Sequence, residues 1–577
     1  MKKILTSVAL AAVLFLLPQC TIREDLEVLK GSLDSLQIMV SNPEFKTMVH
    51  ADFLDSKTLE NVMNHEIEIK IGGKDAAHVY SNIGSKESSY NAFHGFLDLV
   101  INPNAVDTTA MKTTPLEIDL IVSSEGYLST TQRILIYEAR RYSVAVMMTN
   151  VDDAPEGVTI SQNSNFAMTT STGQTILPSV QPMNGGEQIV VIPAGVVLKD
   201  AAGNPVTGTV KSEIVFYDPL SESAQNAFPG GTSVSASLPD GSEGQIEFVS
   251  AGMFTVSLSA GDQKVKTFEN GGITLKTEVS PDLINPNTGV AIKVGDEIEM
   301  WSKEEESGEW VYEKTATVKT EGGKLYLEET VTHLSSWNWD FYYNACSYGP
   351  KFLWRGNVDG AYGNISSQIN SSGYRKSRDV YINTNSYWDN HTQLYNTPSN
   401  QPTTFWFESS SWYKRSTLSF SPSTLEISNL CAGETFIIDV TETKTPVEEV
   451  TIKFDLSASS ASNSQIVVRP NAYLYYYSDA AMYWQSFNLI AGKANFNLEL
   501  GSEYYLYGYM GNFWGSGILR IDKVGSDKLR VTMNPTINFG NSSATNPVSY
   551  EIDRPVNNIV EIKYNAVLPD QIMNMFS

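Results

Sequence analysis

The feature that most constrains the fold of this chain is an alternation of apolar and polar residues that recurs along most of its length. It is clearest at residues 66–71, where isoleucine occupies every second position, and a Gly- and Asp-containing turn follows at residues 72–75. Because successive side chains of a strand point to opposite faces, this alternation predicts half-buried β-strands. Comparable stretches lie at residues 97–101, 116–122, 133–137 and 451–456, and short apolar runs at 189–192 and 213–217 are further candidate strands. The sequence therefore predicts an all-β fold, which its many Tyr, Phe, Val and Thr residues also favour.

The length of the chain and the positions of its turns predict a tandem arrangement of domains. The 577 residues are enough for about three to five domains. We expect several β-sandwich domains of immunoglobulin-like or transthyretin-like type, following a short N-terminal helix. We place them at residues 60–149, 150–345, 346–445 and 446–577, the last being rich in aromatic residues. The second ends after a Trp-rich segment, the third starts at Cys346, and a Thr- and Pro-containing linker at residues 443–446 follows it.

The N-terminus has the features of an export signal. Lys2 and Lys3 precede an uncharged apolar run at residues 4–17, and Cys20 follows. The run is shorter than the roughly 20 residues that span a bilayer, so it predicts a cleaved signal peptide over residues 1–19. A cysteine at the cleavage point resembles a bacterial lipoprotein signal, in which the thiol is acylated, for example with palmitate. An ordinary secreted protein, with an incidental Cys20, is the alternative.

The residues around Cys20 resemble those of Bacteroidetes surface lipoproteins. Pro18 and Gln19 stand where most lipoprotein signals have small residues, and a looser pattern is found in that group. The acidic cluster at residues 23–25 resembles their surface-export signal, although it would also suit the start of a helix. This resemblance implies attachment to the outer membrane through the lipid, with the protein facing the cell exterior.

The segment at residues 20–45 has helical rather than strand periodicity. Apolar residues from Ile22 to Val40 follow a 4-3-4-3-4 spacing, which is the seam pattern of a coiled coil, and Pro43 ends it. We expect a helical, coiled-coil-like stalk that forms a homo-oligomer through residues 22–40. A helix packed on the next domain and a frayed linker are the alternatives.

A family resemblance becomes specific in the second β domain. The motifs are Pro-Ala-Gly at residues 193–195, Phe-Pro-Gly-Gly at 228–231, Gly-Glu-Trp at 308–310 and the Trp-rich segment at 333–340. In this order they resemble the extracellular module of cartilage intermediate layer proteins. The resemblance implies a structural or adhesive role outside the cell, and it brings no catalytic residues. Residues 346–445 more distantly resemble carboxypeptidase-regulatory-like domains.

Composition and motifs argue against several classes of function. The chain has 40 Lys and Arg against 65 Asp and Glu, a net charge of −25, without a basic run; we therefore expect no nucleic-acid partner. No zinc-protease, nucleophile-elbow, phosphate-loop or dinucleotide motif is present, so the sequence predicts no enzyme activity and no cofactor. We also expect no metal site, because the Asp-rich segments at 152–153 and 357–360 are explained by turns, and His333 by a hydrogen-bonded structural role.

Two cysteines remain if Cys20 carries lipid. Cys346 and Cys431 are 85 residues apart, and an exported protein can keep a disulfide between them. Two buried free thiols are the alternative, because the sequence does not fix their separation in space.

Aromatic clusters give the best candidates for a ligand-binding surface. Trp406 and Trp412 lie in the third β domain, and Trp484 and Trp514 lie in the last. Exposed Trp rings suit sugar rings or protein partners, whereas packing across strands would explain the same residues without a ligand. We expect a lipid-anchored, non-catalytic structural or adhesion protein with an extracellular protein or glycan as ligand. A surface glycan-binding lipoprotein is the alternative.

Overall fold

The fold is that of an all-β protein, as the alternation predicts. The computed structural model describes residues 36–568 except 42–46, 64, 82–85, 93–94, 103–110, 112–113, 168–173, 178–186, 305–307, 387–388, 412, 414, 465, 479–482, 511–512, 540–541, 546 and 556. Strands dominate the described residues, and the helical elements are short. The chain divides into two units, one of which is Glu44–Thr445. The other contains Pro446–Ser577 and the strand β1 (Leu36–Ser41).

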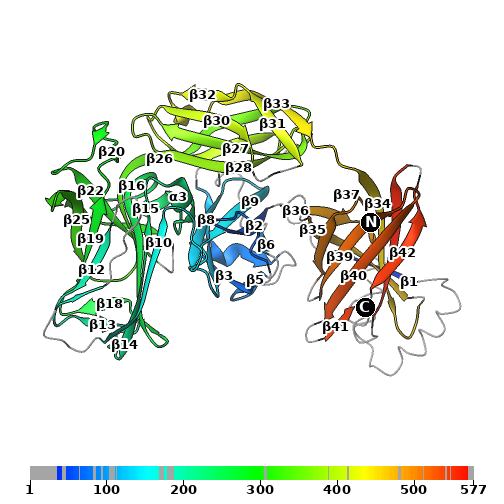
Figure 1. The fold of residues 1–577 in the computed structure, drawn as a ribbon, viewed down its shortest axis with the longest axis horizontal. Helices are drawn as coiled ribbons and strands as arrows, with labels where there is room; N and C mark the ends of the chain where they lie inside the picture. Colours follow the sequence, from blue (N-terminus) through cyan, green and yellow to red (C-terminus); the bar gives the residue numbers. More distant parts are fainter. Residues whose placement is uncertain are drawn as a thin grey trace, which may run out of the picture. The chain divides into compact units, whose positions relative to one another are not determined.

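The first part of the unit Glu44–Thr445 consists of two four-stranded sheets, coloured blue in Figure 1. One sheet has the order β4-β6-β2-β9 and the other the order β5-β3-β7-β8. In β3 (Ile67–Gly72), Ile67 and Ile69 are buried in the core between the sheets, whereas Lys70 is exposed. The other strands are β2 (Met48–Asp55), β4 (Val79–Ser81), β5 (Tyr90–Ala92), β6 (Phe96–Ile101), β7 (Leu116–Ser124), β8 (Thr130–Ile136) and β9 (Arg141–Met148).

The second part is built on a sheet with apolar residues on both faces. The order is β10-β14-β16-β15-β23-β22-β26-β33-β31. One face packs with the five-stranded sheet β11-β12-β19-β25-β24 around Trp337 and Trp339, and the other buries Trp301 and Trp310. The main strands are β10 (Val158–Ala167), β11 (Thr175–Ile176), β12 (Gln188–Ile192), β14 (Thr209–Tyr217), β15 (Ser233–Ser237), β16 (Glu243–Ala260), β19 (Ile273–Val279), β22 (Glu297–Lys303), β23 (Trp310–Thr317), β24 (Lys319–Glu321) and β25 (Lys324–Val331).

One long strand joins the second and third parts of this unit. Strand β26 (Ser336–Gly356) has 21 residues. Its first half pairs with β16 and β22, and its second half pairs with β29 (His391–Pro398) and β33 (Thr435–Lys444). The predicted boundary at residues 345/346 falls inside this strand and needs correction: the two predicted domains share a strand, because backbone pairing continues through the Trp-rich segment.

In the third part, a four-stranded sheet packs against the second half of β26 and the strands that pair with it. This sheet has the order β28-β27-β30-β32, in yellow-green and yellow in Figure 1. Phe352 of β26 contacts Phe405 and Phe407 with ring centroids 5.3 and 5.0 Å apart. The strands are β27 (Asp359–Ile369), β28 (Arg375–Asn383), β30 (Thr403–Ser409), β31 (Ser416–Ser421) and β32 (Thr424–Ile427).

The C-terminal unit is a separate β structure, and its division from the unit Glu44–Thr445 falls at Pro446. Its strands form the order β37-β34-β35-β38-β39-β40-β41, with β36, β42 and β43 attached. Val450, Ile452, Leu519 and Val531 are among its buried core residues. The strands include β34 (Glu449–Ser460), β35 (Ile466–Ser478), β36 (Tyr483–Leu489), β37 (Lys493–Glu499), β38 (Glu503–Met510), β39 (Phe513–Val524), β40 (Lys528–Phe539), β41 (Ser542–Thr545), β42 (Val548–Asp553) and β43 (Ile559–Leu568).

The expected N-terminal helix is wrong for the residues that the structure describes. Residues 36–41 form the strand β1, which pairs in parallel with β35, Leu36 opposite Ile466. Pairing with a distant strand therefore overrides the helical spacing, which apolar residues alone cannot distinguish from a short strand. The remainder of the predicted stalk, including residues 20–35, lies outside the described residues. Within the described residues, no helix is both long and apolar enough to cross a membrane.

Candidate ligand-binding surfaces

The structure describes the side chain of one of the four predicted binding aromatics, Trp406. Cys20 and Trp412 lie outside the described residues. The backbone of Trp484 belongs to β36 and that of Trp514 to β39, but their side chains also lie outside the description. Trp406 can therefore be placed in its surroundings.

Trp406 lies on the outer face of the sheet β28-β27-β30-β32. Its neighbours Phe405 and Phe407 are buried in the core, and Trp406 is half-buried on the opposite face. In the strand register it stands opposite Ser366 of β27 and Thr424 of β32. The guanidinium of Arg375 from β28 lies 5.6 Å from the centre of the indole ring, within the range of a cation–π contact.

Polar side chains surround Trp406 on this face. Arg375 Nε donates to Gln368 Oε1 at 2.8 Å, and the Ser366 hydroxyl donates to Asn364 Oδ1 at 3.0 Å. Further along the sheet, the Thr404 hydroxyl donates to Asn370 Oδ1 at 2.9 Å. An aromatic ring among amide, hydroxyl and guanidinium groups offers both an apolar face and directional hydrogen bonds. This combination suits a polar ligand with an apolar face, such as a sugar ring.

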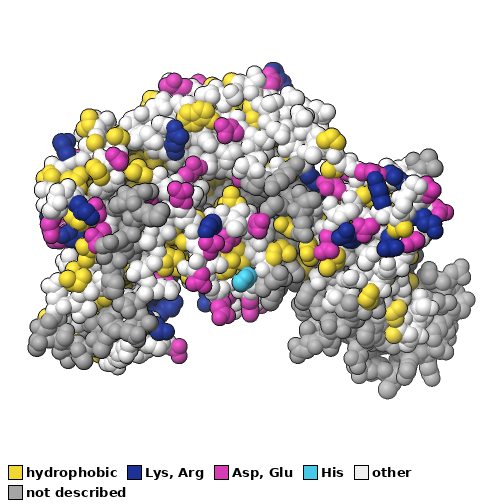
Figure 2. Space-filling view, viewed as in Figure 1, with side chains coloured by type: hydrophobic (Ala, Val, Ile, Leu, Met, Phe, Trp, Pro, Cys, Tyr) yellow, Lys and Arg dark blue, Asp and Glu magenta, His cyan; other side chains and the backbone are white. Residues whose placement is uncertain are grey.

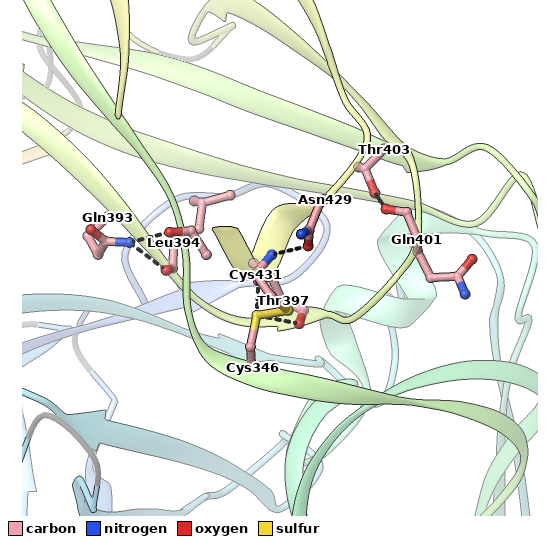
Figure 3. The surroundings of a disulfide bond; sticks show 9 residues. Cys346, Gln393, Leu394, Thr397, Gln401, Thr403, Asn429 and Cys431 are labelled. Carbon is pink, nitrogen blue, oxygen red and sulfur yellow. Dashed lines mark hydrogen bonds between the residues drawn. A yellow bond between two sulfur atoms is a disulfide. The ribbon is translucent and has the colours of Figure 1, made fainter. Parts of the chain in front are cut away.

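Cys346 and Cys431 form a disulfide in the structure, with their Cα atoms 5.7 Å apart. The bond joins β26 to the short 3-10 helix η4 (Leu430–Ala432), as Figure 3 shows. The Asn429 side chain accepts a hydrogen bond from the Cys431 N–H at 3.1 Å, and the Thr397 hydroxyl lies 3.2 Å from the Cys346 sulfur. The disulfide thus holds η4 beside β29.

A cavity of about 130 Å³ lies next to this disulfide. Leu394, Thr397 and Thr403, which Figure 3 labels beside the bond, are among its lining residues. The other walls come from β27, β28 and β30 of the third part and from β15 and β16 of the second.

Two cations of β28, Lys376 and Arg378, also line this cavity. Lys376 Nζ donates to both Glu247 carboxylate oxygens, at 2.7 and 3.0 Å, and to the Ser233 hydroxyl at 2.7 Å. Glu247 is only 2% exposed, so the ion pair neutralises a buried carboxylate. The amino-acid sequence does not mark this site as a functional one. The one feature that could have pointed to it is the spacing of Lys376 and Arg378, which are two residues apart and therefore on the same face of a strand. Nothing in the sequence shows which face of β28 is inward.

His333 and His50 have structural partners. His333 Nε2 lies 3.1 Å from Glu313 Oε1 and its ring packs against Trp337, with centroids 5.0 Å apart. His50 is buried beside Asp98, with Nδ1 2.9 Å from Oδ1. Within the described part of the chain, no group of three His, Cys, Asp or Glu side chains is arranged to hold a metal ion.

Charges of both signs are mixed on the surface. On the face seen in Figure 2, Asp and Glu side chains are spread over both units, with Lys and Arg side chains among them. Together with the net charge of −25, this distribution does not favour binding to a polyanion such as nucleic acid.

Comparison with known proteins gives no family to which the chain can be assigned. No family model matches the sequence, and no curated protein matches it.

Proposed function

We propose that this protein is a lipid-anchored structural or adhesion protein of the cell surface, without catalytic activity. In this proposal Cys20 carries the lipid, residues 1–19 are removed, and the protein faces outward from the outer membrane. Its domains are sandwiches of immunoglobulin-like or transthyretin-like type, including one that resembles the cartilage intermediate layer module. The ligand is an extracellular protein or a glycan.

The observation that carries the proposal is the number of connections between the three parts of the unit Glu44–Thr445. Strand β26 is shared by the second and third parts. The buried Tyr137 of the first part stacks on Tyr395 of the third, with centroids 4.2 Å apart, and donates to Asn396 Oδ1 at 2.9 Å. Asn396 in turn donates to Gln245 Oε1 of the second part at 2.9 Å.

These connections suit a protein that must transmit force or present a distant surface. The first and second parts also bond through their backbones, with the Gly230 N–H donating to the Thr131 carbonyl at 2.7 Å. Shared strands and buried hydrogen bonds between parts resist relative motion more than a flexible linker would.

Exposure on intact cells tests the proposal. Cells are treated with an extracellular protease and the fragments are identified by mass spectrometry, with a cytoplasmic protein as the control for lysis. We expect cleavage of this protein on intact cells and stronger attachment of cells that express it to extracellular matrix or glycan-coated surfaces. Protection from protease until the outer membrane is opened would contradict the surface location.

A second candidate function, glycan capture, is favoured by the polar face around Trp406. An aromatic platform ringed by Ser366, Gln368, Arg375 and Thr424 offers stacking together with hydrogen bonds. A glycan array with purified protein tests it, comparing wild type with Trp406→Ala. Ile437→Ala, which removes another exposed apolar side chain, is the control. We expect glycan binding that falls about tenfold or more in the Trp406 variant alone, a loss of about 1.4 kcal/mol; unchanged binding would exclude this face.

A further inference from the structure

Arg378 occupies a position where a strand usually carries an apolar side chain. In the register of β27 and β28, Arg378 stands opposite Ile365, and Ile365 stands opposite Phe407 of β30. Ile365 and Phe407 are buried in the core. Because directly opposed residues of antiparallel strands share a face, Arg378 is on the inward face of this sheet.

The other inward cation of β28 shows how such a position is normally satisfied. Lys376 is two residues earlier on the same face and is bonded to Glu247 and Ser233. Its charge is therefore matched within the protein. An inward charge is tolerated when a carboxylate and hydrogen bonds accompany it in this way.

Arg378 differs from Lys376 in having no such partner. Across the residues that the structure describes, no hydrogen bond or ion pair is formed by its guanidinium. The side chain of Arg378 is exposed to solvent. The charged neighbour that acts on it is a second cation, Arg140, whose Nε lies 3.7 Å from Glu138 Oε1. A guanidinium with five N–H donors and no protein acceptor is prepared to receive an external anion.

The cavity beside Arg378 has both polar and apolar walls. Its volume is about 130 Å³, and Ser367, Tyr395, Ile365 and Phe405 line it. Ser367 stands opposite Lys376 and so shares the inward face. The disulfide-held helix η4 contributes Leu430. The site therefore combines a guanidinium, a hydroxyl, an aromatic ring and an apolar floor in a small space that solvent can enter.

We propose that this cavity binds an acidic sugar unit through its carboxylate. The planar guanidinium of Arg378 takes the carboxylate with two parallel hydrogen bonds. The ring of Tyr395 and the apolar wall contact the sugar ring, and the Ser367 hydroxyl bonds to a sugar hydroxyl. The inference goes beyond the proposed function, because it requires neither the lipid anchor nor Trp406, which lies on the opposite face of the sheet.

Titration of the purified chain with glucuronate tests this proposal, using ligand-observed NMR or calorimetry. Glucose is the neutral comparison and inorganic sulfate is the comparison without a sugar ring. We expect glucuronate to bind more tightly than either, and Arg378→Met to weaken glucuronate binding roughly tenfold or more. Arg355→Ala, which removes an exposed arginine paired with Asp439, is expected to leave binding unchanged.

Other outcomes would overturn the proposal in distinguishable ways. Absence of glucuronate binding, or equal binding by wild type and Arg378→Met, would remove the site. Equal binding of glucose would remove the role of the carboxylate, and equal binding of sulfate would remove the role of the sugar ring. If Arg378→Met fails to fold, Arg378→Lys keeps the charge but loses the planar fork, and unchanged affinity in that variant would refute bidentate binding. If Trp406→Ala loses glycan-array binding but keeps glucuronate binding, the outer face around Trp406 and the cavity at Arg378 bind their ligands independently.

Discussion

Replacing Cys346 and Cys431 by serine should destabilise the third part of the unit Glu44–Thr445 without changing its folded contacts. The disulfide closes a loop of 85 residues between β26 and η4. In the chain-entropy model, a loop of this length restricts the unfolded state by about 4.5 kcal/mol at 25 °C. The parallel pairing of β26 with β33, from Lys351 opposite Thr435 to Gly356 opposite Val440, does not depend on the sulfur atoms. The effect should therefore appear in the opening of this part.

Hydrogen exchange of the full chain, followed by mass spectrometry, measures this opening. Amides in the core strands β27 and β30 exchange only when the part opens. A change of about 4.5 kcal/mol corresponds to exchange about a thousandfold faster in the double serine variant. Amides of β34 in the other unit serve as the internal control and should not change. If the amides of β27 and β30 exchange less than about tenfold faster in the variant than in the wild type, the reasoning is refuted.

Three further perturbations follow from buried polar groups. Burial alone lowers the pKa of His50, but the charges of Asp52 and Asp98 outweigh it and raise that pKa to about 9. His50→Gln should therefore remove about 3 kcal/mol of stability below pH 6.5, and the difference should vanish as pH rises through about 9; thermal unfolding of both proteins from about pH 6 to 9.5 measures it. Burial raises the pKa of Asp340 well above its usual value, so the folded state holds this proton more tightly and stability is lost as pH rises above about 4. Asp340→Asn should therefore unfold at a higher temperature than wild type at pH 7 but not at low pH, and equal melting at both would contradict the assignment. Tyr137→Phe leaves the buried Asn396 oxygen without its donor, and denaturant unfolding should show a loss of about 1–3 kcal/mol.

Strand periodicity alone was enough to predict the class of fold. The alternating segment at residues 66–71 overlaps β3, in which Ile67 and Ile69 are buried, because alternation in a half-buried strand reflects burial directly. The division near Pro446 also lies where the sequence has a Thr- and Pro-containing linker.

Features that depend on long-range pairing could not be predicted in the same way. Residues 36–41 have apolar spacing that suits a helix, yet they pair with β35, more than 400 residues later. The unbroken strand β26 was divided in the sequence analysis because Cys346 and the Trp-rich segment resembled the edges of separate domains. Local pattern does not reveal that β16 and β22 pair with its first half and β29 and β33 with its second.

The candidate sites could likewise be predicted only as far as local sequence pattern reveals them. The sequence singled out Trp406 from its aromatic neighbours, and alternation with the buried Phe405 and Phe407 explains its place on the outer face. Arg378 was not singled out, because its inward position follows from the register with β27 and its isolation follows from what surrounds the cavity. Neither the inward position of Arg378 nor its lack of a partner can be read from the sequence.

The most direct test of the proposed surface function is mass spectrometry of the mature N-terminus, from protein extracted with the outer membrane. The account predicts that the first residue is Cys20 and that its N-terminal peptide carries the added mass of acyl chains, which Cys20→Ser should abolish together with membrane attachment. A mature chain that begins elsewhere, or an unmodified Cys20 in membrane-associated protein, would contradict it.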